Sequence, residues 1–217
     1  MSHSIFVTGG TGYMGSWLIP LLVKRGHEVK ALVRKGSEMK LPPGASGVIG
    51  DALQMDSYTE HVRGADTFAH LIGVPHPSPA KAAQFRNVDL VSAQVAIKAA
   101  RDAGVRHFVY LSVAHPAPVM KAFIEVRTKG EAMVRETGIP ATFLRPWYVL
   151  GPGHRWPYFL VPVYWIAERF PVTKSSARRL GFVTIQQMVN ALVWAVENPP
   201  DQIHVIDVPR IRKITLN

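Results

Sequence analysis

The sequence predicts an α/β protein built on a doubly wound, mostly parallel sheet of about seven strands, with a small C-terminal lobe. Two observations lead to this fold class. Short apolar runs typical of buried parallel strands alternate along the chain with segments of helical periodicity. Three glycines, Gly9, Gly12 and Gly15, stand between the first apolar run and the first helical segment. Glycines at such a turn let the backbone come close to a diphosphate.

The first 35 residues read as one strand–turn–helix–strand unit. Residues 5–7 form the first apolar strand, and residues 29–33 form the second. The intervening helix is indicated by apolar residues at helical spacing: Trp17, Leu18, Leu21 and Leu22. Gly26 is placed to end this helix. The N–H groups and the positive dipole end of the helix would then hold the diphosphate of a dinucleotide.

Arg34 ends the second strand, about twenty residues beyond the glycine turn, where the choice between nicotinamide cofactors is made. An acidic residue there would bind the ribose hydroxyls of NAD, whereas an arginine favours the extra 2′-phosphate of NADP. Lys35 follows, and no acidic residue is in reach. We therefore expect NADP(H) to be preferred over NAD(H). The alternative is a solvent-facing Arg–Lys pair.

The remaining elements continue the alternation. After a loop at residues 41–44, strands are expected near residues 47–50, 67–71, 107–111, 141–144 and 203–208, and helices over residues 54–63, 81–103 and 183–197. Parallel sheets of this kind bind ligands at the carboxyl ends of their strands. We therefore expect the strand-end residues to converge on one cleft: Gly9, Arg34, Asp51, Leu71 and Ser112.

The spacing Thr8-Gly9-x-x-Gly12-x-x-Gly15 resembles the fingerprint of the short-chain dehydrogenase/reductase superfamily, in particular its atypical, NmrA-like and epimerase-like members. The resemblance covers about residues 4–200 and implies an NAD(P)-binding Rossmann domain. It also implies that the segment Thr11, Gly12, Tyr13 and Met14 wraps the cofactor diphosphate.

The resemblance extends to the third and fourth strand ends. It implies that Asp51, followed by Ala52, contacts the adenine amino group; the alternative for Asp51 is a helix N-cap. It implies that the backbone of Leu71, Ile72 and Gly73 lines the cofactor ribose. Only Gly73 matches the Asn-Asn-Ala-Gly of typical members, and we expect His70 to be a packed residue rather than a catalyst.

The catalytic set of the superfamily is a Ser after the fifth strand, a Tyr thirteen residues on and a Lys four beyond the Tyr. From Ser112 this spacing gives Glu125 and Lys129, and no Tyr of the chain has a Lys four residues later. Lys129 then binds the ribose while Glu125 or another group moves the proton, or Lys129 is itself the proton donor. In a third interpretation the two form an ordinary i,i+4 ion pair. We expect Lys129 to contact the cofactor, and Ser112 to orient the substrate or cap its strand.

Residues 145–153 resemble an Arg-Pro-x-x-Val-x-Gly-Pro segment that opens the substrate region in extended and atypical members. Aromatic residues crowd this part of the chain: Trp147, Tyr148, Trp156, Tyr158, Phe159, Tyr164, Trp165 and Phe170. They wall an apolar substrate pocket, cover a dimer face, lie on a membrane surface, or pack the core of a small helical lobe. We treat residues 1–217 as one domain in which residues 147–182 form this lobe.

Composition narrows the possible partners. The chain of 217 residues has no cysteine, which excludes disulfides and thiolate chemistry. Its net charge of +10 is scattered and accompanies no nucleic-acid-binding motif, so we expect no nucleic acid partner. The nine histidines lack metal-ligand spacing, and we expect no metal. The N-terminus enters a strand at once, and no apolar run is long enough to span a bilayer, so we expect a cytoplasmic protein. Peripheral membrane contact and a homodimer are left open.

Together these features predict an NADP(H)-binding oxidoreductase of the atypical short-chain type that acts on a small carbonyl or apolar substrate. The alternative is a non-catalytic NAD(P)-binding regulator or assembly factor, as NmrA-like proteins and complex I accessory subunits are. Loss of the Tyr favours the alternative, and Ser112 with Lys129 at the superfamily spacing opposes it. A third hypothesis is a membrane-surface protein. The chain is short for a sugar-nucleotide epimerase of the superfamily.

Overall fold

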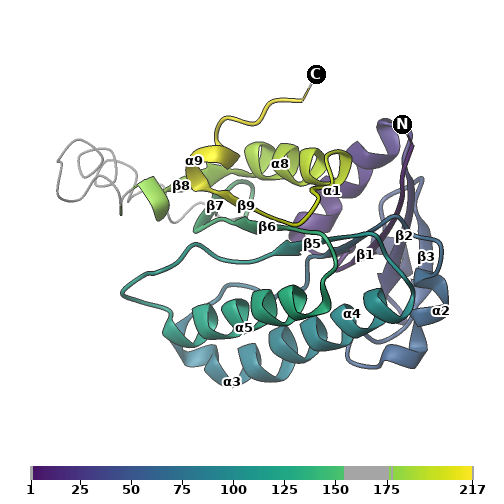
Figure 1. Cartoon of the computed structure of the whole chain (residues 1–217), viewed down its shortest axis with the longest axis horizontal. Coiled ribbons are helices and arrows are strands. Elements are labelled where there is room, and N and C mark those ends of the chain that lie inside the picture. Colours follow the sequence, from purple (N-terminus) through teal and green to yellow (C-terminus); the bar gives the residue numbers. More distant parts are fainter. Residues whose placement is uncertain (1, 154–175, 177, 217) are drawn as a thin grey trace.

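The computed structural model describes residues 2–153, 176 and 178–216, which form three layers with a sheet in the middle (Figure 1). The seven strands of this sheet all run parallel in the order β3-β2-β1-β4-β5-β6-β9. They are β1 (Ser4–Thr8), β2 (Glu28–Val33), β3 (Ser46–Ile49), β4 (Thr67–His70), β5 (His107–Leu111), β6 (Ala141–Arg145) and β9 (Ile203–Asp207). The expected doubly wound parallel sheet is confirmed.

Helices cover both faces of the sheet (Figure 1). One face carries α1 (Tyr13–Lys24), α8 (Ile185–Glu197) and α9 (Val208–Ile211). The other carries α2 (Thr59–Val62), α3 (Ala82–Gln84), α4 (Val91–Asp102) and α5 (Lys121–Thr137). Each face has its own apolar core, the first built around α1 and α8 and the second around α4 and the ring of Tyr58. Burial on both faces explains why the strands read as continuous apolar runs.

Local signals in the sequence fix the ends of the helices. α8 begins with a capping box, in which the Thr184 hydroxyl accepts the Gln187 N–H at 3.2 Å and the Gln187 side chain accepts the Thr184 N–H at 2.9 Å. It ends before Asn198 and two prolines, as expected. α1 ends at Lys24, and Gly26 takes the left-handed conformation with φ of 85°.

Several elements differ from the predicted ones. The long helix expected over residues 81–103 begins as a 3-10 turn (Pro79–Lys81) and α3, then passes through a π-helical turn (Phe85–Leu90) before α4. A π-helical turn shifts the facing of the residues around it, and here it lies beside a fully buried Asp89. The helix expected over residues 54–63 is a 3-10 turn (Met55–Ser57) followed by the short α2. A further 3-10 turn spans Glu38–Lys40.

A small second sheet pairs β7 (Tyr148–Leu150) with β8 (Phe182–Thr184) in parallel. These strands flank the stretch that was expected to form the lobe over residues 147–182. Residues 154–175 and 177 lie outside the described residues, and so do six of the aromatic residues named for the lobe: Trp156, Tyr158, Phe159, Tyr164, Trp165 and Phe170. The lobe and its roles therefore stay predictions.

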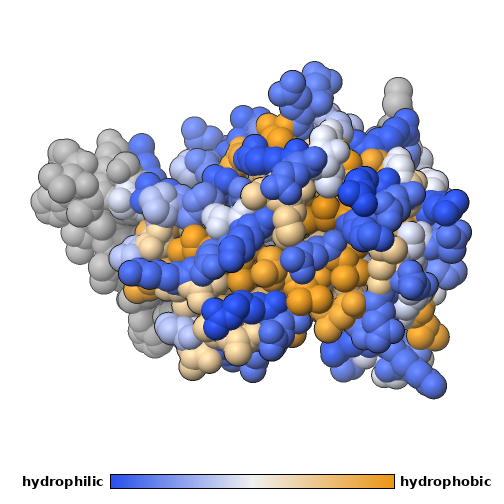
Figure 2. Space-filling view, turned by 60° about the horizontal axis from the view of Figure 1, so that its bottom comes forward, coloured by the Kyte–Doolittle hydropathy of each residue, from blue (hydrophilic) through white to orange (hydrophobic). Residues whose placement is uncertain are grey.

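Figure 2 brings the lower face of Figure 1 forward and shows apolar side chains near its middle with hydrophilic ones around them. Within the described ranges, no helix has the length and apolar character needed to cross a bilayer. In the same part of the chain, no three acidic or histidine side chains come together in a way that could hold a metal ion. The homodimer stays a prediction.

Candidate functional site

A cleft of about 1240 Å³ opens at the carboxyl ends of the strands. It is lined by all five strand-end residues that were expected to converge: Gly9, Arg34, Asp51, Leu71 and Ser112. Other predicted cofactor residues also line it: Thr11, Gly12, Tyr13, Met14, Ala52, Ile72 and Gly73. The location of the cleft was therefore predicted correctly, because parallel strands bring their carboxyl ends to the same edge of a sheet.

The glycine turn depends on backbone geometry that only glycine allows. Gly9 has φ of 81°, and its carbonyl accepts the Gly12 N–H at 3.0 Å. Gly15 is buried and does not line the cleft. A Cβ atom on Gly15 would lie 2.5 Å from both the Cα atom and the carbonyl oxygen of Gly10. Gly15 thus allows α1 to start directly against the turn, which is a packing role rather than a ligand contact.

The N-terminus of α1 is free to receive an anion. Its N-cap, Gly12, has no side chain to accept the first N–H groups, and no acidic residue stands in the first turn. Thr11, Tyr13 and Met14 place this end of the helix at the cleft. Uncapped N–H groups and the positive end of the helix dipole favour a phosphate, so this end of the cleft fits the diphosphate of a dinucleotide.

Arg34 and Asp51 lie at the ends of β2 and β3. The Arg34 side chain is exposed, lines the cleft and forms no ion pair with the residues the structure describes, whereas Lys35 does not line it. The Asp51 carboxylate accepts the Leu53 N–H at 2.9 Å. Asp51 therefore caps a turn, not a helix as the alternative interpretation had it. Its position in the cleft leaves the adenine contact as a prediction.

Ser112 belongs to a polar cluster beneath the cleft. Its hydroxyl donates to the Glu131 carboxylate at 2.6 Å. Glu131 is almost fully buried and is also held by a two-pronged ion pair with Arg145, in which Nε lies 2.8 Å from Oε1. Because the Ser112 hydroxyl proton is donated to Glu131, the hydroxyl oxygen can only accept a hydrogen bond from a ligand in the cleft.

The structure does not bring Glu125 or Lys129 to the cleft. Both side chains are more than half exposed, and the Lys129 Nζ atom lies 2.7 Å from the Glu125 carboxylate. This contact lowers the pKa of Glu125, which a general acid at neutral pH would need to have raised. The i,i+4 ion pair, the third interpretation of this pair, is confirmed.

A different pair on α5 lines the cleft. Phe123 and Arg127 have the four-residue spacing of the superfamily's Tyr and Lys, and both face the cleft. The ring of Phe123 lies under the guanidinium of Arg127, with 5.1 Å between the Arg127 Cζ atom and the ring centroid. The sequence analysis missed both residues, because it counted a fixed distance from Ser112 instead of finding the buried face of the helix.

Arg127 is fixed in place by an ion pair and two backbone contacts. Its Nη2 atom lies 2.5 Å from the Asp89 carboxylate, and both side chains are buried. Nη2 also donates to the Ile72 carbonyl at 3.1 Å, and Nη1 donates to the Leu111 carbonyl at 2.9 Å. Burial raises the pKa of the Asp89 carboxyl, an effect that the Arg127 guanidinium opposes. The guanidinium thereby ties α5 to the ends of β4 and β5.

Residue 73 must be a glycine because the Arg127 guanidinium occupies the space that a Cβ atom would need. A Cβ atom on Gly73 would lie 2.5 Å from Arg127 Nη2 and 3.3 Å from the Asp89 carboxylate. The Val74 N–H next to it donates to Asp89 at 3.1 Å. Gly73 is the one residue in its segment that matches the superfamily pattern, and in this protein it makes room for the Arg127–Asp89 pair.

His70 is a packed residue, as expected. It is fully buried, its Nδ1 atom lies 2.8 Å from the Thr8 hydroxyl, and its ring stacks on Tyr110. Burial lowers its pKa to about 3. His70 therefore stays neutral at physiological pH and does not act as an acid or base there.

This low pKa predicts a loss of stability in acid. Between the ordinary pKa of 6.5 and about 3, the unfolded chain binds a proton at His70 that the folded protein does not. At pH 5 this should cost about 2 kcal/mol of unfolding free energy relative to pH 7.5. Urea unfolding of wild type and His70→Gln at both pH values measures it. From pH 7.5 to pH 5, the unfolding free energy of the variant should fall by about 2 kcal/mol less than that of wild type. Equal falls in the two proteins would contradict the low pKa of His70.

The far wall of the cleft is mostly apolar. Its apolar members come from the loop after β4, the loop before α5 and the segment after β6: Val74, Pro75, Pro77, Val119, Met120, Trp147 and Val149. His76 and Ser78 of the loop after β4 are polar members of the lining. Tyr148 belongs to the same wall and stacks on Phe182 at 5.3 Å between ring centroids. Trp147 and Tyr148, the members of the aromatic stretch that fall within the described residues, thus both lie at the cleft.

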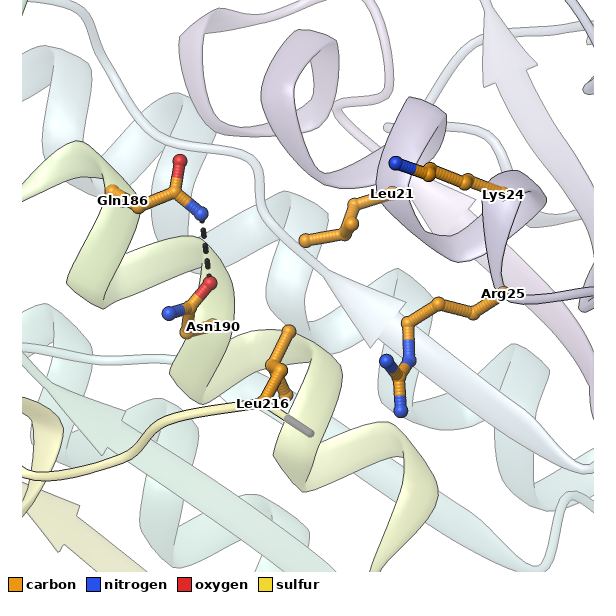
Figure 3. A pocket seen from close by; sticks show the side chains of 6 residues that line it. All are labelled: Leu21, Lys24, Arg25, Gln186, Asn190 and Leu216. Carbon is orange, nitrogen blue, oxygen red and sulfur yellow. Dashed lines mark hydrogen bonds between the residues drawn. The ribbon is translucent and has the colours of Figure 1, made fainter.

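A second hollow of about 740 Å³ lies between α1, α8 and the C-terminal segment (Figure 3). Its lining residues are Leu21, Lys24, Arg25, Gln186, Asn190 and Leu216. The Gln186 Nε2 atom donates to Asn190 Oδ1 at 2.8 Å, and Arg25 is held by Glu197. None of the predicted site residues lies here, so the cleft at the strand ends is the candidate site.

The fold and the cleft define a dinucleotide-binding protein of the Rossmann type. The chain belongs to the NAD(P)H-binding family, whose sequence profile matches residues 9–155. The resemblance to atypical and epimerase-like short-chain dehydrogenases/reductases is thereby confirmed.

Two relatives and one solved structure illustrate the comparison. A ceramide reductase of Caulobacter vibrioides is 26% identical over 205 residues, which are 90% of this chain and 61% of the relative. A 4-hydroxy-2-methyl-3-oxo-4-farnesyl-3,4-dihydroquinoline-1-oxide ketoreductase of Stigmatella aurantiaca is 32% identical over 109 residues, covering 49% of this chain and 32% of the relative. This chain therefore spans less than two thirds of the length of either relative. The Bordetella bronchiseptica enzyme WbmH in complex with NAD+ superposes with a TM-score of 0.71 at 18% identity, over 95% of this chain and 76% of that one.

Proposed function

We propose that this protein is an NADP(H)-dependent oxidoreductase of the atypical short-chain type that acts on an apolar substrate. The observation that carries the proposal is the cleft itself. It joins an uncapped helix N-terminus behind a glycine turn, an arginine at the end of β2 that has no ion pair among the described residues, and a mostly apolar wall on its far side. When bound, the nicotinamide would supply or take up the hydride.

The preference for NADP(H) rests on Arg34. A guanidinium at the end of the second strand, with no ionic partner in the part of the chain that the structure describes, is suited to bind a 2′-phosphate through two parallel hydrogen bonds. In this proposal Asp51, at the neighbouring strand end, would contact the adenine, and the N-terminus of α1 would hold the diphosphate. These residues would bind and orient the cofactor; none of them takes part in proton transfer.

A titration of NADPH and NADH against the purified protein tests this preference, with Trp147 at the cleft as an intrinsic fluorescence reporter. We expect NADPH to bind at least about tenfold tighter, a difference of about 1.4 kcal/mol. Arg34→Asp should remove that preference, because a carboxylate repels the 2′-phosphate and favours ribose hydroxyls. Arg63→Asp, on an exposed residue that does not line the cleft, is the matched control for charge. Equal binding of the two cofactors by wild type would refute the preference.

A substrate would lie against the apolar wall. This wall contains the uncharged side chains of Trp147, Val119 and Met120. A substrate bound against them would exclude water from the part of the cleft opposite the glycine turn. Ser112 would accept a hydrogen bond there, since its own proton is held by Glu131. Apolar ligands with a hydroxyl or N–H donor are therefore the class that suits the wall best.

One observation favours a second candidate, a non-catalytic NAD(P)H-binding regulator. The two cleft residues with the superfamily's catalytic spacing are Phe123, which has no proton to give, and Arg127, which is held in an ion pair. Neither can act as the general acid of a carbonyl reduction. Oxidation of NADPH by a panel of aldehydes and quinones separates the candidates. Turnover of any member supports the oxidoreductase, and tight NADPH binding without turnover supports the regulator.

A further inference from the structure

We propose that Glu131 is a specificity-determining residue: by holding the proton of the Ser112 hydroxyl, it makes the cleft bind an apolar alcohol in preference to the matching carbonyl compound. This inference deepens the proposed function and rests on its substrate site, since it presupposes that an apolar ligand lies against Ser112. It names the member of an alcohol–carbonyl pair that the site favours. Glu131 does not line the cleft, so it acts through Ser112 and is a positioning residue.

Ser112 is the member of the buried polar cluster that a ligand can reach. It follows β5, is 4% exposed and lines the cleft together with its neighbours Leu111 and Val113. Its N–H donates to the Leu144 carbonyl at 2.8 Å, which fixes the backbone at this point. A hydroxyl in such apolar surroundings contributes to ligand selectivity through the direction of its hydrogen bond.

The Glu131 carboxylate determines that direction. Its Oε1 atom accepts the Ser112 hydroxyl at 2.6 Å and the Arg145 Nε–H at 2.8 Å. A carboxylate paired with a guanidinium has only acceptor sites, so the proton between Ser112 and Glu131 belongs to the serine. His115 Nε2 lies 4.0 Å from the same oxygen, beyond hydrogen-bond distance. The Ser112 oxygen therefore turns its lone pairs, and not its proton, toward the cleft.

A carbonyl ligand would meet the wrong side of the Ser112 hydroxyl. Its oxygen is an acceptor and would face the lone pairs of the serine oxygen, which leaves two acceptors without a donor. Turning the hydroxyl toward the ligand instead would break a charge-assisted hydrogen bond to Glu131, which is one of the strong kinds. An alcohol avoids both costs, because it donates its own proton to the serine oxygen. Sites that pair with a donor on the ligand reject analogues that lack it.

The test compares ligands that differ only in the oxidation state of one carbon atom. Menthol is titrated against menthone, and cyclododecanol against cyclododecanone, by calorimetry without cofactor, so that no turnover occurs. Wild type should bind each alcohol at least about fivefold tighter than its ketone. Glu131→Gln should lower this ratio at least about threefold through a gain in ketone affinity, because a neutral amide holds the serine proton less strongly than a carboxylate does. Damage to the fold would not produce such a gain.

Two further variants separate the contributions of the hydroxyl and the carboxylate. Ser112→Ala should lose the preference through weaker alcohol binding, because it removes the acceptor. Glu125→Gln makes the same chemical change as Glu131→Gln at an exposed position of α5, and it should leave the ratio unchanged. If Glu131→Gln does not fold, the double variant Glu131→Met/Arg145→Met decides, since it removes the ion pair without leaving an unpaired charge. The same fall in the ratio is expected there.

Three results would overturn the proposal: equal binding of alcohol and ketone by wild type, binding of neither member of either pair, or the wild-type ratio in the Glu131 variant that folds. Failure of NADPH to bind in the titration described above would instead refute the proposed function. The two failures are distinguishable because the alcohol and ketone titrations contain no cofactor.

Discussion

Asp89→Asn is expected to lower the free energy of unfolding by about 3–5 kcal/mol, because it removes one partner of a buried ion pair. Asp89 is fully buried and Arg127 nearly so, and their charged atoms are 2.5 Å apart. The asparagine keeps the shape and an acceptor for the Val74 N–H, but it leaves the guanidinium without a compensating charge. Urea-induced unfolding of wild type and variant measures the difference.

The chain offers a matched control on the same helix as Arg127. Glu125→Gln removes the carboxylate of an exposed ion pair with Lys129, and an i,i+4 pair of this kind is worth about 0.3–0.5 kcal/mol. The double variant Asp89→Asn/Arg127→Met should regain part of the loss, because it buries no unpaired charge. A loss below about 1 kcal/mol in Asp89→Asn would show that water or other groups already compensate Arg127.

The contrast between these two ion pairs also shows what could be predicted on α5. The Arg127–Asp89 and Lys129–Glu125 pairs each join a carboxylate to a cation, and no sequence motif marks either pair. They differ in burial: the first pair is buried and the second is more than half exposed. The buried residues of α5 are Val126, Arg127, Gly130, Glu131 and Val134, which recur at helical spacing. Lys129 is two residues beyond Arg127, about 200° around the helix. Reading this face first would have selected Arg127, with Gly130 marking the close approach of the helix to Tyr110.

The sheet and the position of the cleft could be predicted because their causes are local. Apolar runs form the strands, the glycine spacing forms the turn, and parallel strands place Gly9, Arg34 and Ser112 at one edge. The π-helical turn beside Asp89 and the Ser112–Glu131–Arg145 cluster arise from contacts between distant segments. Such contacts leave no periodic pattern in the sequence, so the partners of Ser112 and Arg127 needed the structure.

Gly15→Ala is expected to lower the affinity for NADPH about a hundredfold, or about 2.7 kcal/mol. The added Cβ atom would lie 2.5 Å from two backbone atoms of Gly10, and backbone cannot move aside as the end of a side chain can. The start of α1 must therefore shift away from the glycine turn, which misplaces the N–H groups that would hold the diphosphate. Overpacking should also lower the unfolding free energy by about 1–3 kcal/mol. Calorimetric titration with NADPH and urea unfolding measure the two effects.

Gly104→Ala separates the loss of binding from the loss of stability. Gly104 follows α4 with φ of 72°, and a Cβ atom there would meet no other atom within 4 Å. An alanine in this left-handed conformation costs about 1–2 kcal/mol of stability, yet it lies away from the cleft and should leave NADPH affinity unchanged. Equal affinity losses in the two variants would trace the effect to stability alone. Wild-type affinity in Gly15→Ala would mean that the diphosphate does not bind at the start of α1.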